Sequence, residues 1–90
     1  MTDPVWNPHT RYTLDPDVAL RPEPFGALAY HYRSRRLTFL RSTLLADLVR
    51  NLGDHASVEE ALAASVPEGR RPSYRKALAS LAQSRFIRAG

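Results

Sequence analysis

The sequence predicts an α+β fold in which three strands are followed by three helices. In short runs up to about residue 40, side chains of similar character recur at every second position, which is typical of strands. From about residue 42 onward, apolar residues recur at the three- and four-residue spacing of helices. Turn-forming segments separate these runs. The length of 90 residues favours a single small domain.

The three strands are predicted in the first half of the chain. Val18 and Leu20 alternate ahead of Pro22, and because proline cannot donate a ladder hydrogen bond, this strand should end at an edge or in a turn. The segment FGALAYHY, residues 25–32, forms the second strand. The residues RSRR then make a turn into a third strand over 37–40.

Residues 1–10 are predicted to form a flexible N-terminal tail, and residues 11–90 the folded domain. The tail carries two prolines and an asparagine and shows no periodicity. It also contains Trp6, which we expect to pack back on the domain.

Capping residues predict where the helices begin and end. Ser42 can cap the first helix, and Gly53 is placed to terminate it. Ser57, with a glutamate three residues later, forms a capping box for the second helix. Pro72 suits the first turn of the third helix. The predicted order is therefore β-β-β-α-α-α.

Composition and motifs argue against catalysis. The chain has no cysteine, and its three histidines are scattered, so no metal site is expected. The glycine motifs that bind phosphates or dinucleotides do not occur, nor does a nucleophile motif. We therefore expect no enzymatic activity and no cofactor. The chain also lacks a signal peptide and a membrane-length apolar run, which predicts a cytoplasmic protein without a membrane partner.

The charge balance favours an acidic partner. Thirteen lysines and arginines stand against nine acidic residues, for a net charge of +4. Such a charge suits nucleic acid or an acidic peptide, although it can also serve solubility alone.

The third strand is a candidate binding surface. It has neither a proline nor an inward-pointing charge, so its outer edge looks unprotected. Such an edge can accept an extended peptide as an added strand, and Thr38→Pro is then expected to abolish binding. Alternatively, residues 1–12 or the first strand cover the edge. Beside it, Ala79 and Ala82 of the third helix would leave a shallow groove.

The stretch VALRPEPFGALAYHYRSRRLTFL and the terminal ALASLAQSRFIR resemble the mycofactocin-biosynthesis peptide chaperones. The resemblance covers about residues 11–88. That family belongs to a wider group of precursor-peptide recognition domains, which includes the pyrroloquinoline-quinone chaperone. The resemblance implies a winged-helix-like domain that has no catalytic activity. It further implies that the domain binds the leader of a short, acidic precursor peptide and presents it to a radical-SAM maturase.

In the wider group, the leader adds to the third strand and lies against the third helix. The resemblance therefore implies that the peptide contacts Arg36, Leu37, Thr38, Phe39, Leu40, Tyr74, Arg75, Leu78, Ala79 and Ala82. Of these, Leu78 fits the core as well as the groove. This chain departs from the wider group at Arg85, which stands where a glycine is usual.

Two other functions fit parts of the sequence. A winged-helix protein can bind DNA, and basic residues such as Arg71 and Lys76 on the third helix can contact phosphates. However, the sheet precedes the helices here, and the last helix offers few side chains that read bases, so we expect no nucleic-acid partner. The other alternative is a structural subunit whose free edge serves self-association or permanent docking to an enzyme.

Overall fold

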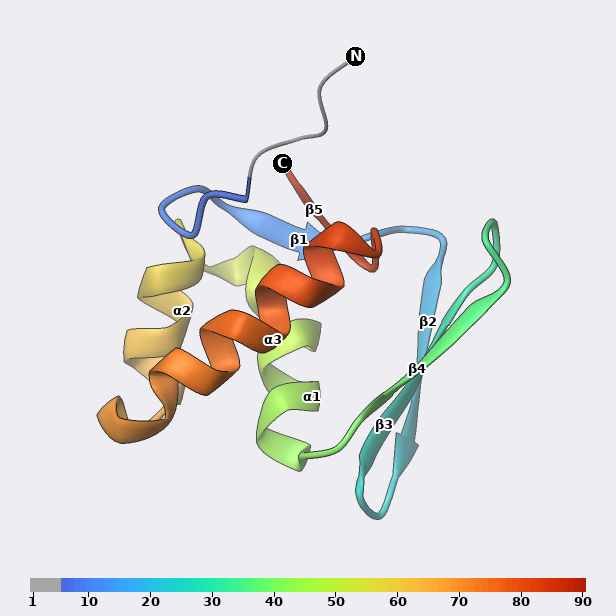
Figure 1. Cartoon of the computed structure of the whole chain (residues 1–90), viewed down its shortest axis with the longest axis horizontal. Coiled ribbons are helices and arrows are strands. Elements are labelled where there is room, and N and C mark those ends of the chain that lie inside the picture. Colours follow the sequence, from blue (N-terminus) through green and yellow to red (C-terminus); the bar gives the residue numbers. More distant parts are fainter. Residues whose placement is uncertain (1–5) are drawn as a thin grey trace.

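The computed structural model describes residues 6–90 and shows a small sheet beside three helices (Figure 1). In chain order the elements are β1 (Tyr12–Leu14), β2 (Val18–Glu23), β3 (Gly26–His31), β4 (Arg36–Leu40), α1 (Thr43–Arg50), α2 (Val58–Ser65), α3 (Arg71–Gln83) and β5 (Ile87–Ala89). Short 3-10 turns at Leu52–Asp54 and Glu68–Arg70 join the helices. The predicted α+β fold, with a three-stranded sheet ahead of three helices, is confirmed.

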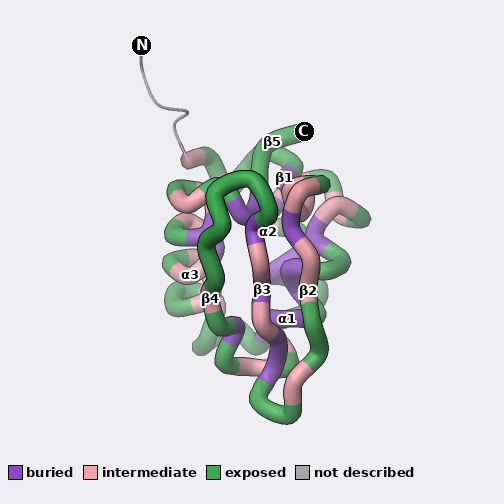
Figure 2. The backbone as a smooth tube through the Cα atoms, turned by 90° about the vertical axis from the view of Figure 1, so that its right-hand side faces the viewer, coloured by how far each residue is buried: buried purple, intermediate pink, exposed green. Residues whose placement is uncertain are grey.

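The sheet is antiparallel with the strand order β2-β3-β4. Its inner face packs on the helices, whereas no helix among residues 6–90 covers its outer face (Figure 2). The central strand alternates accordingly: Ala27, Ala29 and His31 are buried, and Leu28 and Tyr30 are half-exposed. The small alanine side chains on the inner face leave room for α1 to pack closely against β3.

One core joins the sheet to the helices. Leu40 at the end of β4, Leu62 of α2, Leu78 of α3 and Ile87 of β5 are each at most 2% exposed. Burial of an aliphatic side chain of this size stabilises a fold by about 1.5–3 kcal/mol. The sheet and the helices therefore fold as one unit.

Strands β1 and β5 pair with each other and form a second, two-stranded sheet that the sequence did not predict. In this antiparallel pair Tyr12 lies opposite Ala89, and Leu14 lies opposite Ile87. Arg11 reinforces the pairing, because its guanidinium donates to the carbonyl of Gly90 at 2.7 Å. With three residues each, these strands are too short for their periodicity to be read from sequence.

The N-terminal caps of α1 and α2 lie where the sequence placed them, whereas α1 ends at Arg50, before the predicted terminator Gly53, which lies in the 3-10 turn Leu52–Asp54. The hydroxyl of Ser42 accepts a hydrogen bond from the Leu45 amide at 3.0 Å, and that of Ser57 accepts one from the Glu60 amide at 3.1 Å. At the other end of α2, the guanidinium of Arg71 donates to the Val66 carbonyl at 2.8 Å. Arg71 thus ties the start of α3 to the end of α2.

The described part of the expected tail, residues 6–10, packs on the domain. The ring of Trp6 lies 5.0 Å from that of Tyr12, between centroids, which confirms that this tryptophan packs back. The carbonyl of Pro8 accepts from the amide of Glu59 at 2.9 Å, so the segment is anchored to the start of α2. The remainder of the expected tail, residues 1–5, lies outside the described residues.

Candidate functional site

The far side of β4 is a free strand edge. This strand pairs with β3 on one side, and on its other side no strand of residues 6–90 lies against it (Figure 2). The alternative that the first predicted strand covers the edge is wrong, because this strand is β2, which pairs with β3 on the opposite side of the sheet. Of residues 1–12, the other candidate, residues 1–5 lie outside the described residues. Residues 6–10 are bonded to the start of α2, and Tyr12 belongs to β1, which pairs with β5.

The opposite edge of the sheet is less suited to accept a strand. It is formed by β2, which contains Pro22 within the strand and is followed by Pro24. Proline lacks the N–H that a partner strand would need, and it is typical of protected edges.

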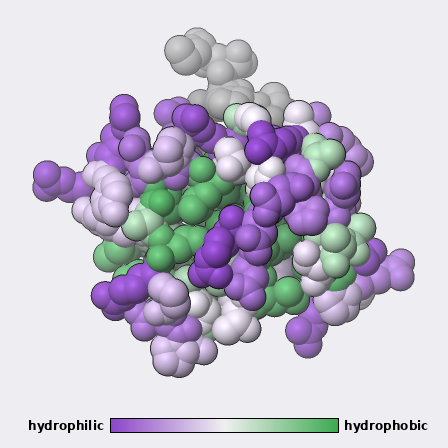
Figure 3. Space-filling view, turned by 180° about the vertical axis from the view of Figure 1, so that it is seen from behind, coloured by the Kyte–Doolittle hydropathy of each residue, from purple (hydrophilic) through white to green (hydrophobic). Residues whose placement is uncertain are grey.

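Figure 3 shows the molecule from behind, where apolar surface gathers in one area bordered by polar side chains. A hollow of about 420 Å³ lies between β2 and α1.

Two backbone hydrogen bonds establish which groups of β4 face the free edge. The amide of Tyr32 donates to Asp17 at 2.9 Å, and the amide of Arg35 donates to the carbonyl of His31 at 2.8 Å. Because backbone direction alternates along a strand, residues 27, 29 and 31 of β3 are directed toward β4. Their register partners are Leu40, Thr38 and Arg36, which bond back to β3. The N–H and C=O groups of Leu37 and Phe39 are therefore left for the free edge.

The side chains of Leu37 and Phe39 lie on the outer face of the sheet. They are 59% and 57% exposed, although both are large and apolar. The ring of Phe39 lies 5.8 Å from that of Phe25, between centroids, and Tyr30 is the register partner of Leu37. An added strand would place every second side chain beside this apolar surface.

Helix α3 runs alongside β4 in the opposite direction and is held at one end by a hydrogen bond. The hydroxyls of Tyr74 and Ser42 lie 2.9 Å apart, and Ser42 follows directly after β4. At the other end, Ser84 and Arg36 line the same cavity. On a helix, Tyr74 shares a face with Ala77 and Leu81, and this face looks toward the free edge.

A different face of α3 is turned toward α2. The guanidinium of Arg75 grips the carboxylate of Glu59 with two hydrogen bonds, the one from Nη2 measuring 2.8 Å. Ala79 and Ala82 follow Arg75 at helical spacing, so they share this face. Leu78 lies between the two faces and is fully buried.

The structure therefore brings together only part of the residues proposed from the sequence. Tyr74 lies beside the strand segment 36–40, whereas Arg75, Ala79 and Ala82 lie toward α2 and Leu78 is in the core. The side chain of Leu40 is also buried, and its backbone bonds back to β3, so Leu40 is not available to a ligand at the free edge. Two residues that the sequence reasoning missed, Ala77 and Ser84, lie on the strand side. Both residues follow Tyr74 at helical spacing, so this spacing in the sequence was the signal that could have identified them.

The Arg75–Glu59 pair has a pH-dependent role in stability. The guanidinium of Arg75, through its hydrogen bonds, lowers the pKa of Glu59. The stabilisation is therefore present above the ordinary pKa of a glutamate and is lost as the pH falls through the lowered value. The side chains are 35% and 29% exposed, so solvent screening limits the effect to about 0.5–1 kcal/mol at neutral pH.

We expect Arg75→Gln to lower the free energy of unfolding by that amount at neutral pH and to have no effect below the lowered pKa of Glu59. Urea denaturation at the two pH values measures this difference. Arg50→Gln, which removes the exposed pair with Asp47, is the matched control. A loss of stability with Arg75→Gln that is the same at both pH values would contradict the role of the pair.

Known proteins similar to this chain carry the peptide-chaperone description. The model of the peptide chaperone MftB family matches residues 11–88. The chain belongs to this family. The peptide chaperone MftB of Mycolicibacterium smegmatis is 40% identical over 92% of this chain and 82% of the relative. Its counterparts in Mycobacterium ulcerans and Mycobacterium tuberculosis are 41% and 37% identical, over 92% and 91% of the chain and 77% and 76% of their own lengths. No solved structure matches.

Membership in the MftB family makes the chain a peptide chaperone rather than an enzyme, as the sequence predicted. Within residues 6–90, histidine and acidic side chains nowhere gather in a group of three or more that could hold a metal ion. In the same part of the chain, no helix is both long and apolar enough to span a membrane.

Proposed function

We propose that this protein binds the leader of a precursor peptide as an additional strand on β4. The main support for this proposal is the free edge of β4. There, the N–H and C=O groups of Leu37 and Phe39, two of each, have no strand partner among the described residues. Main-chain hydrogen bonds to such an edge supply affinity without regard to side chains. The length of β4, five residues, allows the leader to form about four of these bonds.

The two faces of the added strand meet different surroundings. Side chains directed outward lie beside Leu37 and Phe39, which favours apolar residues at these positions of the leader. Side chains directed inward lie between β4 and the face of α3 that carries Tyr74 and Ala77. Alternation between the two faces restricts the register of the leader, because a shift by one residue exchanges them.

The charges around the edge favour an acidic leader. Arg35 and Arg36 lie before or at the start of β4, and Arg41 follows its end. All three are exposed, so they attract an acidic peptide over a distance of about 8–10 Å at moderate salt.

The resemblance to mycofactocin-biosynthesis chaperones supports a second step. The chaperone would present the bound leader to a radical-SAM maturase, which modifies another part of the same precursor. The chain needs no catalytic group for this task. Its contribution is to hold the leader in one extended conformation and so lower the entropic cost of the encounter with the enzyme.

DNA binding remains the alternative to be tested. Two of the basic residues on α3 are already engaged within the protein, since Arg71 binds the end of α2 and Arg75 binds Glu59. This reduces the number of cations available to phosphates on α3. It favours the peptide over nucleic acid as the ligand.

Amide hydrogen exchange followed by NMR tests the proposed function. In the free protein, the amides of Leu37 and Phe39 should exchange fast, whereas that of Thr38 is protected by β3. Addition of a synthetic acidic precursor leader should protect the amides of Leu37 and Phe39 and leave that of Thr38 unchanged. A DNA duplex of equal charge is the control ligand, and the mass in solution is measured in parallel to detect self-association through the edge. Protection by DNA alone, or none with the leader, would contradict peptide binding at β4.

A further inference from the structure

Large apolar side chains form a continuous patch on the outer face of the three-stranded sheet. We call it the outer patch, and it consists of Phe25, Leu28, Tyr30, Tyr32, Leu37 and Phe39. Leu28 and Tyr30 are half-exposed, and the other four are between 44% and 59% exposed. The sheet face that carries the patch is turned toward the viewer in Figure 2, and no helix of residues 6–90 covers it. Apolar surface gathered in this way is typical of a site where another protein binds.

Contacts between neighbouring strands hold the side chains of the outer patch in place. Leu28 lies opposite Phe39, and Tyr30 lies opposite Leu37. The rings of Tyr30 and Tyr32 meet edge to face, with their centroids 5.3 Å apart. Side chains that are already ordered lose little conformational entropy when a partner covers them, which favours binding.

The border of the outer patch on the β2 side has no net charge. Arg21 and Glu23 lie there, opposite Leu28 and Gly26 of β3. They form an ion pair with each other at 2.7 Å. This side of the patch therefore suits a partner whose surface is apolar and uncharged. On the β4 side, the border is the free edge that the leader fills in the proposed function.

A second copy of this chain suits the outer patch poorly. A stable protein–protein interface involves about 20–30 residues on each side, whereas the patch provides only the six named above. Each copy also carries a net charge of +4. Mutual repulsion between two such copies opposes self-association through this small surface.

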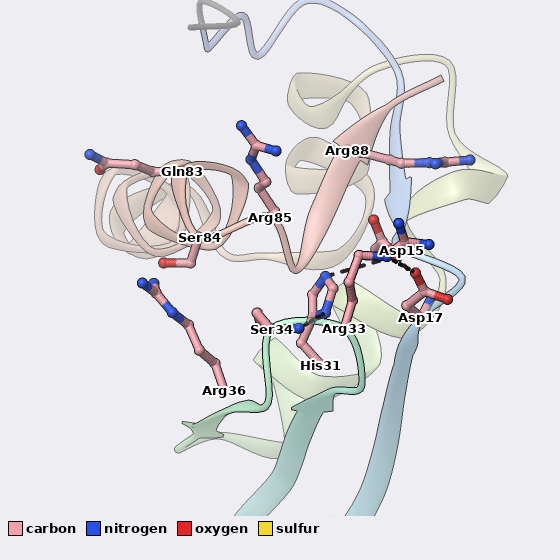
Figure 4. Close-up of a pocket in the computed structure, with 10 residues that line it drawn as sticks. All are labelled: Asp15, Asp17, His31, Arg33, Ser34, Arg36, Gln83, Ser84, Arg85 and Arg88. Carbon is pink, nitrogen blue, oxygen red and sulfur yellow. Dashed lines mark hydrogen bonds and ion pairs between the residues drawn. The ribbon is translucent and has the colours of Figure 1, made fainter.

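Positive charge is concentrated at the β3–β4 turn, which begins next to Tyr32 (Figure 4). Arg33, Arg36, Arg85 and Arg88 are among the residues that line a cavity of about 520 Å³ there. In Figure 4, the side chains of Arg36, Arg85 and Arg88 come from separate elements and point away from one another. They spread positive charge over this end of the molecule and do not converge on one anion site. Two copies that met at this end would repel each other.

A leader bound to β4 would extend the outer patch by one strand. Every second side chain of an added strand is directed to the outer face, where it lies beside Leu37 and Phe39. A protein that covers the patch would therefore contact the sheet and the leader at the same time. Such a protein would bind the leader-bound chaperone more tightly than the free chaperone.

We propose that the outer patch docks the radical-SAM maturase and that the bound leader forms part of the docking surface. The inference rests on the proposed binding of the leader to β4 and specifies the surface used in the second step. A small patch suffices, because another part of the precursor occupies the enzyme at the same time. Two linked contacts raise the effective concentration to about the millimolar range when the linker is short. A weak docking contact also permits release after the precursor has been modified.

Replacement of two tyrosines tests this docking surface. Tyr30→Thr combined with Tyr32→Thr removes the edge-to-face pair of rings, and threonine suits a strand. Strand β4 separates both positions from the leader, so the affinity for the leader should stay that of the wild type. Fluorescence anisotropy of the labelled chaperone, saturated with a synthetic acidic leader, should show that the maturase binds the double variant about tenfold more weakly. Tyr32→Thr alone changes a side chain that is 58% exposed, so it keeps the fold, and it should weaken docking by about threefold.

Leu20→Thr is the matched control. Leu20 is a half-exposed leucine of the same sheet, as Leu28 is, but it lies opposite the buried Ala29 and lines the hollow between β2 and α1. This change should leave docking of the maturase unchanged. If the tyrosine variants bind the leader and still dock like the wild type, or if Leu20→Thr weakens docking equally, the outer patch is not the docking surface and the proposed function stands. If the wild type does not bind the leader, the proposed function itself fails.

The same titration without the leader tests whether the leader belongs to the docking surface. The wild type alone should bind the maturase at least about fivefold more weakly than the leader-bound wild type. Equal affinities would overturn this part of the proposal. Analytical ultracentrifugation of the chaperone alone should show a monomer. A dimer that the double tyrosine variant dissociates would overturn the proposal, because a second copy would then cover the outer patch.

Discussion

Phe39→Pro is expected to weaken leader binding by at least about tenfold while the protein stays folded. The amide of Phe39 faces the free edge, so its loss removes a donor to the leader but none to β3. The proline ring also projects into the path of an added strand. Proline is tolerated on an edge strand where its nitrogen faces outward, and the domain should therefore keep its circular dichroism spectrum.

The matched variant Phe39→Val separates the backbone from the ring. Valine keeps the amide and suits a strand, so this change reports only the loss of the aromatic contact. Fluorescence anisotropy with a labelled acidic leader measures both affinities. Equal binding by the proline and valine variants would show that the leader does not pair with β4.

Gly26→Ala is expected to produce the largest loss of stability. The φ of Gly26 is 149°, and an added Cβ would lie 2.0 Å from the carbonyl oxygen of Leu40 and 2.8 Å from the amide of Ser42. These are backbone atoms, which cannot move aside without breaking the junction between β4 and α1. We expect a destabilisation of about 3 kcal/mol or more, which lowers the melting temperature by over about 10 °C.

Gly69→Ala is the control for this substitution. Nothing lies within 4 Å of the position where its Cβ would be, and its φ is not in the left-handed region. Thermal unfolding followed by circular dichroism should therefore give a melting temperature close to that of the wild type. A similar, small effect at both glycines would contradict the close packing at Gly26.

The strand edge itself was predictable from local pattern, but its hydrogen-bonding direction was not. Sequence periodicity predicts that Leu37 and Phe39 share one face of the strand. It does not reveal which amides point to β3, and Thr38→Pro therefore does not separate a loss of peptide binding from a loss of the strand. The register with β3 shows that Thr38 bonds inward, so a proline there breaks the sheet rather than the peptide contact alone.

On the helix side of the site, too, the sequence predicted the local pattern but not the contacts between distant residues. The apolar stripe of α3 was visible in the sequence, and Leu78 at its centre is buried. The basic residues near the start of α3 looked equivalent, yet Arg75 is bound to Glu59 and Arg71 to the carbonyls of α2. Their partners are 16 and 5 residues away in sequence. Only the packing of α3 on α2 brings them together.

By itself, the sequence determined the α+β class, the order of the three-stranded sheet and the three helices, the N-terminal helix caps and the absence of cysteine chemistry. These features depend on local periodicity, on capping and on composition, which act over a few residues. The tertiary structure alone decided the pairing of β1 with β5, the free edge of β4 and the pairing of Arg75 with Glu59. Such features arise from contacts between distant segments, whose geometry depends on the packing of the whole core and is not encoded in any short stretch of the chain.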